Sequence, residues 1–184
     1  MSEVHEESGW EFEFVGAIGV DKLDAQGQRL PQGMSLVDFV VEETDRCLLL
    51  EVKNPSATPL PHRTRQADAQ RVRRTDGSFI SEKLVPKARD SYTYLHLMAR
   101  DDKPLVFVLL DDPSLFGPDA ALLLPREDDI IRHIRHEAAE PWKRLYIRDC
   151  IVVTPDTWSR AFPEYALRRA PTIQADLPPP TPTP

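Results

Sequence analysis

The chain has 184 residues and a mass of 21.0 kDa, which fits one domain with a short tail. Hydrophobic residues make up 41% of the sequence and charged residues 29%, and no stretch approaches the ~20 apolar residues of a membrane-spanning helix. The net charge of -7 argues against indiscriminate binding of nucleic acid over the whole surface, although residues 52–103, with 11 Lys or Arg against 6 Asp or Glu, form a basic segment between acidic ones.

The first third of the chain is predicted to form β-strands. Trp10–Phe14 alternates aromatic residues with glutamates, as in a half-buried strand, and an extension of this strand to Val20 is open. Residues 24–28 indicate a turn. Leu36–Glu42 and Cys47–Lys53 are rich in apolar and β-branched residues, and a short polar connection joins them. This pattern predicts an antiparallel hairpin.

A basic stretch without sustained periodicity follows the hairpin and covers residues 55–78. Its arginines are Arg63, Arg65, Arg71, Arg73 and Arg74. A short helix around residues 67–74 is open. Stretches of this length without clear secondary structure are usually functional or disordered.

Helices and strands alternate in the remainder of the chain. We expect helices over residues 87–100, with a start as early as Ser81, and 127–140, strands over 104–110 and 149–153, and a last helix from Pro155 with Thr154 as its cap. Helical spacing relates Ala88, Ser91, Leu95 and Met98. The order of elements predicts a single α/β domain, residues 1–175, in which helices flank a mixed central β-sheet. The Pro- and Thr-rich residues 176–184 are predicted to be a disordered tail.

The N-terminus and the cysteines bear on the cellular location. The first seven residues are acidic and polar, unlike the start of a secretory signal peptide. Cys47 and Cys150 lie inside apolar runs and are predicted to be buried free thiols. We therefore expect a cytoplasmic protein.

Three polar residues of the predicted hairpin form the sharpest feature of the sequence. Side chains alternate along a strand, so Glu51 and Lys53 share one face. Opposed residues of a tight hairpin have residue numbers with a constant sum. That sum is 89 for Glu42 and Cys47, and it is also 89 for Asp38 and Glu51. The two carboxylates are therefore predicted to be cross-strand neighbours, unless a bulge intervenes.

When two carboxylates lie this close to each other, one of them has to take a proton or find a cation. Like charges repel, and a divalent cation relieves the repulsion. Carboxylate oxygens are the ligands that Mg²⁺ and Mn²⁺ prefer. Lys53, on the same face, can hold a water molecule or neutralise charge that develops on a phosphate. The three residues thus predict a phosphodiesterase site, and a solvent-facing hairpin that only maintains solubility is the plain alternative.

The sequence from Asp38 through Glu51-Val52-Lys53, with twelve residues between the first two, resembles the signature of the PD-(D/E)XK nuclease superfamily. The resemblance extends over residues 10–110 and implies a restriction-endonuclease-like core. It implies that Asp38, Glu51 and the Val52 carbonyl bind the metal ion. It also implies that Asp38, Glu51 and Lys53 are the catalytic residues.

The chain departs from this pattern at two points. Val37 precedes Asp38 where the name-giving motif has proline. Many members carry a further glutamate on an N-terminal helix, and the segment before Trp10 is short for a helix. The candidates for that glutamate are Glu6, Glu7, Glu11 and Glu13. The number of metal ions is therefore open.

Four basic residues are candidates for nucleic-acid binding. The guanidinium groups of Arg71, Arg73 and Arg74 match phosphate geometry, with a solvated loop as an equal alternative. Lys87 belongs to a stripe of the helix that follows the basic stretch, where the resembled family often places a polar site residue. A solvated helix face is the more economical explanation for Lys87. The stripe also holds Lys83, Asp90 and Tyr94.

The favoured interpretation is a nuclease that cleaves phosphodiester bonds of nucleic acid with Mg²⁺ or Mn²⁺. We expect DNA as the substrate, with RNA left open, and a role in defence or repair by analogy of fold alone. A homodimer or a larger complex is compatible with this function. The first alternative is a catalytically inactive nuclease-fold subunit that binds nucleic acid or scaffolds a complex. The second is a metal-independent interaction domain that works through its Pro-rich tail.

Overall fold

The computed structural model describes residues 3–23, 33–54, 78–112 and 123–171. These residues form a five-stranded sheet with the strand order β3-β4-β5-β6-β7 and a three-stranded sheet with the order β1-β2-β8. The elements are β1 (Val4–Glu7), β2 (Trp10–Phe14), β3 (Gly19–Lys22), β4 (Phe39–Glu42), β5 (Cys47–Lys53), the π-helical turn η1 (Ile80–Leu84), α2 (Val85–Leu97), β6 (Leu105–Asp111), α3 (Leu123–Arg135), β7 (Asp149–Val153), α4 (Pro155–Ala161) and β8 (Tyr165–Arg169).

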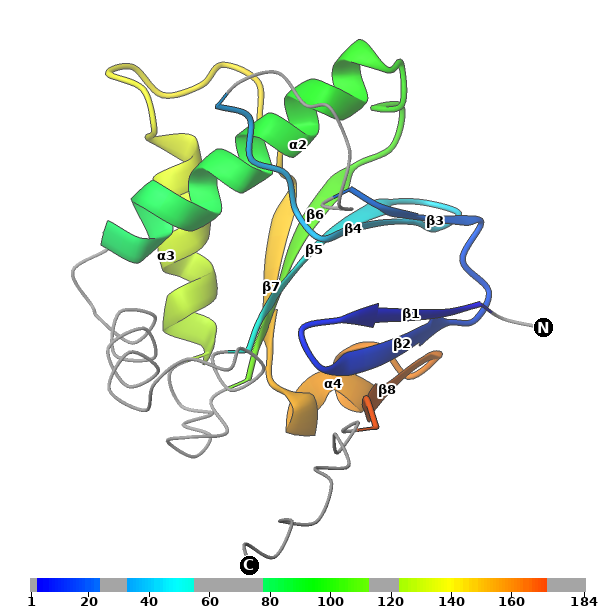
Figure 1. Ribbon diagram of the computed structural model, residues 1–184. Coiled ribbons are helices and arrows are strands. Elements are labelled where there is room, and N and C mark those ends of the chain that lie inside the picture. Colours follow the sequence, from blue (N-terminus) through cyan, green and yellow to red (C-terminus); the bar gives the residue numbers. More distant parts are fainter. Residues whose placement is uncertain (1–2, 24–32, 55–77, 113–122, 172–184) are drawn as a thin grey trace, which may run out of the picture.

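The five-stranded sheet lies between two different layers (Figure 1). Helices α2 and α3 cover one face, and the three-stranded sheet with α4 covers the other. Strand β6, which lies between β5 and β7, is buried along its whole length, as its continuous apolar run predicts, and it pairs in parallel with both neighbours. The predicted mixed α/β architecture is therefore confirmed, and the chain adds a second sheet that the sequence pattern did not predict.

The β4–β5 hairpin has the register that the index sum predicts. Its four antiparallel pairs run from Phe39 opposite Leu50 to Glu42 opposite Cys47, and the residue numbers of every pair add up to 89. No bulge therefore separates the turn from the end of the ladder at Phe39. Asp38 is the residue directly before this end.

Strand β4 is shorter than the predicted strand 36–42, because it starts at Phe39. The backbone N–H groups that would continue the ladder bond to side chains instead. Val37 N–H donates to Ser91 Oγ of α2 at 3.0 Å, and Val52 N–H donates to Asp38 Oδ2 at 2.6 Å. These side chains satisfy the donors and end the pairing one residue after Asp38.

The N-terminal strands differ from the sequence prediction in extent. Strand β2 ends at Phe14, as the alternation predicts, and the possible extension to Val20 does not form. The chain turns at Gly16, which has a positive φ of 84°, and a separate strand, β3, then pairs with β4. Strands β1 and β8 flank β2 and were not predicted.

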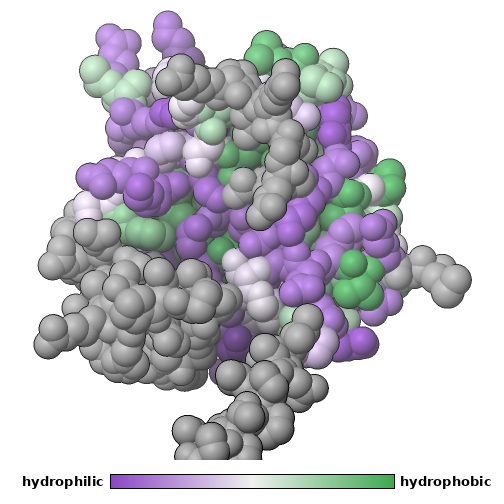
Figure 2. Space-filling model, in the orientation of Figure 1, coloured by the Kyte–Doolittle hydropathy of each residue, from purple (hydrophilic) through white to green (hydrophobic). Residues whose placement is uncertain are grey.

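The first predicted helix, 87–100 with a start as early as Ser81, has the early start but ends sooner than predicted. The π-helical turn η1 precedes α2, which begins at Val85 and ends at Leu97. Two residues further on, Ala99 takes a positive φ of 54°. Met98 therefore lies outside the helix and is 55% exposed, instead of continuing the buried face. In Figure 2 a hydrophobic patch marks this end of α2, where Leu97 is also exposed, on a face that is otherwise mainly hydrophilic or grey.

The second predicted helix, 127–140, is shifted towards the N-terminus, because α3 covers Leu123–Arg135. Pro141 disfavours helical conformation in the residue before it. After the end of α3 the Trp142 N–H donates a hydrogen bond to the Arg135 carbonyl at 3.3 Å. Strand β7 and helix α4 have their predicted positions, and Thr154 caps α4 through a capping box with Thr157.

Cys47 and Cys150 are buried free thiols, as predicted. Burial raises the pKa of both thiols, so they stay protonated near neutral pH. Among the described helices none has the length and apolar character needed to cross a membrane. The predicted turn at residues 24–28 and the tail at 176–184 lie outside the described residues.

Candidate functional site

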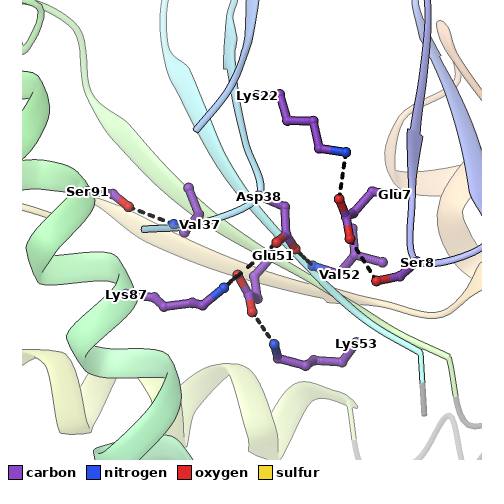
Figure 3. A network of polar contacts seen from close by, with 10 residues as sticks. All are labelled: Glu7, Ser8, Lys22, Val37, Asp38, Glu51, Val52, Lys53, Lys87 and Ser91. Atoms are coloured by element: carbon purple, nitrogen blue, oxygen red, sulfur yellow. Dashed lines mark hydrogen bonds and ion pairs between the residues drawn. The ribbon is translucent and has the colours of Figure 1, made fainter. Parts of the chain in front are cut away.

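The structure brings Asp38, Glu51 and Lys53 together on the helix-covered face of the large sheet (Figure 3). Glu51 continues the alternation of Cys47 and Leu49, whose side chains pack in the core beneath α2 and α3. The Lys53 ammonium forms an ion pair with Glu51 Oε1. The three residues thus share one face, as the strand periodicity predicts.

Helix α2 adds a fourth charged group to this cluster. The Lys87 ammonium lies 2.8 Å from Glu51 Oε2 and 3.7 Å from Asp38 Oδ1, so one cation contacts both carboxylates. The Lys87 side chain is only 15% exposed. The expectation that Lys87 belongs to a solvated helix face is therefore wrong, because the packing of α2 turns this side chain towards the strands (Figure 3).

Both carboxylates of the cluster are buried. Glu51 is 0% exposed and Asp38 is 5% exposed. Burial and the neighbouring Glu51 charge raise the pKa of Asp38 to about 7, although Lys87 and the Val52 N–H act in the opposite direction. Burial is the largest cause of the raised pKa, so the Lys87 charge only partly offsets the cost of an ionised carboxylate at this position.

The backbone of Val52 faces Asp38, beyond the end of the β4–β5 ladder. In a strand the N–H and C=O of one residue point to the same side, and the Val52 N–H donates to Asp38 Oδ2. The Val52 carbonyl therefore also points to the side of β4, beyond the first residue pair of the β4–β5 ladder. Two carboxylates and a main-chain carbonyl therefore lie near the end of the β4–β5 ladder.

This donor set fits a hard divalent cation. Mg²⁺ and Mn²⁺ prefer oxygen ligands, often one or two carboxylates with water completing the shell. Within residues 3–23, 33–54, 78–112 and 123–171, no group of three or more His, Cys, Asp or Glu side chains is arranged to hold a metal ion. The candidate site therefore offers two carboxylates and a carbonyl, with Lys53 and Lys87 as its resident cations.

A second charged pair lies at the same end of the sheet. Asp111 is the register partner of Lys53 on the neighbouring strand β6, and its buried carboxylate forms an ion pair with Arg126 of α3. Sequence reasoning missed Asp111 and Arg126. A polar residue at the end of a buried apolar strand was the available signal for Asp111, whereas nothing local marks Arg126.

Ser91 is another residue that was missed as a part of the site. It follows Lys87 by one helical turn, and its hydroxyl accepts the Val37 N–H directly before Asp38. The sequence placed Ser91 on the apolar stripe of the helix, where a buried polar residue signals a specific hydrogen bond.

The N-terminal glutamates lie on the strands β1 and β2. Glu7 is the one of these whose charge helps to raise the pKa of Asp38, and its carboxylate contacts the Lys22 ammonium at 2.8 Å. Figure 3 shows Glu7 on the side of Val52 away from Lys87. A glutamate near the site thus comes from a strand here and not from an N-terminal helix.

The remaining candidates for nucleic-acid binding, Arg71, Arg73 and Arg74, lie outside the described residues. Comparison of the chain with protein-family models, with curated proteins and with solved structures found no match.

Proposed function

We propose that this protein is a metal-dependent nuclease that cleaves phosphodiester bonds of nucleic acid, with DNA as the expected substrate. The observation that supports this most directly is the juxtaposition of the buried Asp38 and Glu51 carboxylates with the Val52 carbonyl and Lys53 at the end of β5. The PD-(D/E)XK resemblance implies three strands followed by a helix and a further strand, and β3, β4, β5, α2 and β6 follow one another in that order. We therefore propose a restriction-endonuclease-like core within the observed α/β fold.

In this proposal Asp38, Glu51 and the Val52 carbonyl hold Mg²⁺ or Mn²⁺. The bound ion supplies Lewis-acid polarisation of the scissile phosphate and lowers the pKa of a water ligand. With Glu51 as a ligand of the ion, the Lys53 ammonium, which here pairs with Glu51, would be available to orient the attacking water or to stabilise charge on the phosphate. Lys87 then balances the remaining carboxylate charge from the helix side.

The test is cleavage of a supercoiled plasmid and of a single-stranded RNA by the purified chain, with Mg²⁺, with Mn²⁺ and with EDTA. Cleavage should require the metal and should be lost in Asp38→Asn. Asp45→Asn is the matched control, because Asp45 is exposed in the hairpin turn and its loss should leave the rate unchanged. Equal cleavage by both variants would remove Asp38 from the proposed site.

A catalytically inactive nuclease-fold subunit is the second candidate function. The observation that favours it is the pairing of Glu51 with two lysines, Lys53 and Lys87, which balances the two carboxylates without a metal. Such a protein would bind nucleic acid, or scaffold a complex, without cutting. Nucleic-acid binding by wild type without any cleavage in Mg²⁺ or Mn²⁺ would select this alternative.

The cellular setting is part of the proposal. A cytoplasmic nuclease that acts in defence or repair agrees with the free buried thiols and with the predicted chemistry. A homodimer or a larger complex would supply a second site for the second strand of a duplex, as restriction-type cleavage usually needs. Light scattering in the presence and absence of DNA would test that assembly.

A further inference from the structure

Arg169 is held in an unusual way at the end of β8. One of its terminal nitrogens lies 2.8 Å from Asp112 Oδ2, and the carboxylate of Asp112 is only 3% exposed. The guanidinium carbon also lies 4.0 Å from the centre of the Trp10 ring on the neighbouring strand β2. A buried carboxylate and an aromatic face thus fix the position of a side chain that is itself 50% exposed.

This arrangement places Arg169 at the end of the sheet that carries the candidate site. The Asp112 N–H donates to the Lys53 carbonyl at 2.8 Å, so Asp112 lies beside the end of β5. Lys53 and Asp111 face the helices, whereas Asp112 is one residue further along and faces the three-stranded sheet. Arg169 therefore lies at the same strand ends as Lys53, on the opposite face of the sheet.

The fixed guanidinium retains binding capacity. It has five N–H donors, and the contact with Asp112 engages one terminal nitrogen. Its planar fork matches the oxygens of a phosphate, and an arginine that is already oriented loses less conformational entropy on binding. Arg168, the preceding residue, points to the opposite face of β8 and is 69% exposed, and its ion pair within the described part of the chain is a distant one with Glu13 at 3.9 Å.

We infer that Arg169 is a phosphate-binding residue, which Asp112 and Trp10 orient to contact the sugar–phosphate backbone of nucleic acid at the carboxyl end of β5. The inference rests on the proposed function. It adds a backbone contact on the face of the sheet opposite to Lys53, so the bound strand crosses the ends of β5 and β6. Such a contact carries affinity without sequence preference.

The experiment measures binding of a short DNA duplex and of the matching RNA duplex by fluorescence anisotropy over a series of salt concentrations. Divalent ions are left out, so that binding is separated from cleavage. Arg169→Ala should bind about tenfold more weakly, equally for unrelated sequences, and the slope of log Kd against log salt should fall by about one unit. Whether Arg169→Ala loses affinity for the DNA duplex, for the RNA duplex or for both identifies the backbone that Arg169 contacts.

Arg168→Ala is the matched control and should keep the affinity of wild type. Arg169→Gln removes the charge but keeps a polar side chain that can cover Trp10, so it tests the lost charge if Arg169→Ala unfolds. Wild-type affinity and salt slope in Arg169→Gln or in a folded Arg169→Ala would overturn the inference and leave Arg169 as a link between the sheets. Intact metal-dependent cleavage alongside that result would show that only this inference fails, whereas a wild type that neither binds nor cleaves would overturn the proposed function with it.

Discussion

The Val52 N–H donates to Asp38 Oδ2 at 2.6 Å, and this bond links the end of one strand of the hairpin to the middle of the candidate site. It orients the Asp38 carboxylate towards β5 and stops the ladder one residue after Asp38. The opening lets the Val52 carbonyl face the two carboxylates. The same hydrogen bond therefore builds the donor set and explains why the strand is short.

Lys53 should be required for cleavage and not for metal binding. In the proposed mechanism Lys53 acts on the water and the phosphate, so Lys53→Ala should lower the cleavage rate by ~10²–10³. Mg²⁺ binding, measured by calorimetry, should be retained and be at least as tight as in wild type, because Lys53 is not a ligand and its ion pair with Glu51 competes with the ion. Wild-type cleavage by Lys53→Ala would show that the Glu51-Val52-Lys53 assignment is wrong.

Mg²⁺ or Mn²⁺ should stabilise the folded protein by linkage. Thermal unfolding of wild type should shift to higher temperature as the metal concentration rises, because the folded carboxylate pair binds the ion and the unfolded chain does not. Asp38→Asn should abolish the shift, and Asp45→Asn should retain it. An equal shift in both variants would locate the metal elsewhere in the chain.

Stability without metal should fall as pH rises from about 4 to about 7. The ordinary pKa of Asp38 is 3.8 and its folded value is about 7, so in this window the folded protein binds a proton that the unfolded chain has released. Each unit of pKa difference corresponds to ~1.4 kcal/mol. Urea titrations at about pH 5, inside this window, and at about pH 8, above it, should show wild type losing stability relative to Asp38→Asn as the pH rises. A difference that is independent of pH would contradict the buried, raised pKa of Asp38.

Lys87 should stabilise the protein in the absence of metal. Lys87→Ala removes one cation from the buried carboxylates and should cost up to ~3 kcal/mol, below the full loss for a broken buried pair because Lys53 remains. The Mg²⁺-dependent rise in melting temperature should then be larger than in wild type, since a competing cation is gone. Lys83→Ala, at an exposed position one turn earlier on the same helical stripe, should differ from wild type by less than ~0.5 kcal/mol. Equal stability and an equal metal-dependent shift in both variants would show that Lys87 does not stabilise the buried carboxylates.

Neutralising Arg71, Arg73 and Arg74 together should weaken binding of nucleic acid for all sequences alike. Phosphate contacts are electrostatic, so the dependence of Kd on salt should become flatter in the triple alanine variant. Cleavage at saturating substrate should be affected much less than binding, in contrast to Lys53→Ala. Unchanged affinity and salt slope would mean that these arginines belong to a solvated loop.

The sequence by itself determined the hairpin and the face on which its acidic residues lie. Strand alternation and the short turn between Glu42 and Cys47 are local properties, and they set the register that aligns Asp38 with Glu51. Local signals also predicted the start of α4 at the Thr154 cap and the buried strand β6. These features need only neighbouring residues, so periodicity and capping chemistry were sufficient.

Only the tertiary structure decided which distant side chains complete the candidate site. Ser91 ends the ladder of β4 across 54 positions of sequence, and Lys87 reaches Glu51 across 36. Strand β8 pairs with β2 from the far end of the chain and positions Arg169 over Trp10. Such contacts depend on how helices and sheets pack against a shared core, and a helix carries the same periodicity whichever way its polar stripe finally faces. The alternation of the hairpin therefore predicted the carboxylates, whereas the cation that neutralises them depended on the packing of α2.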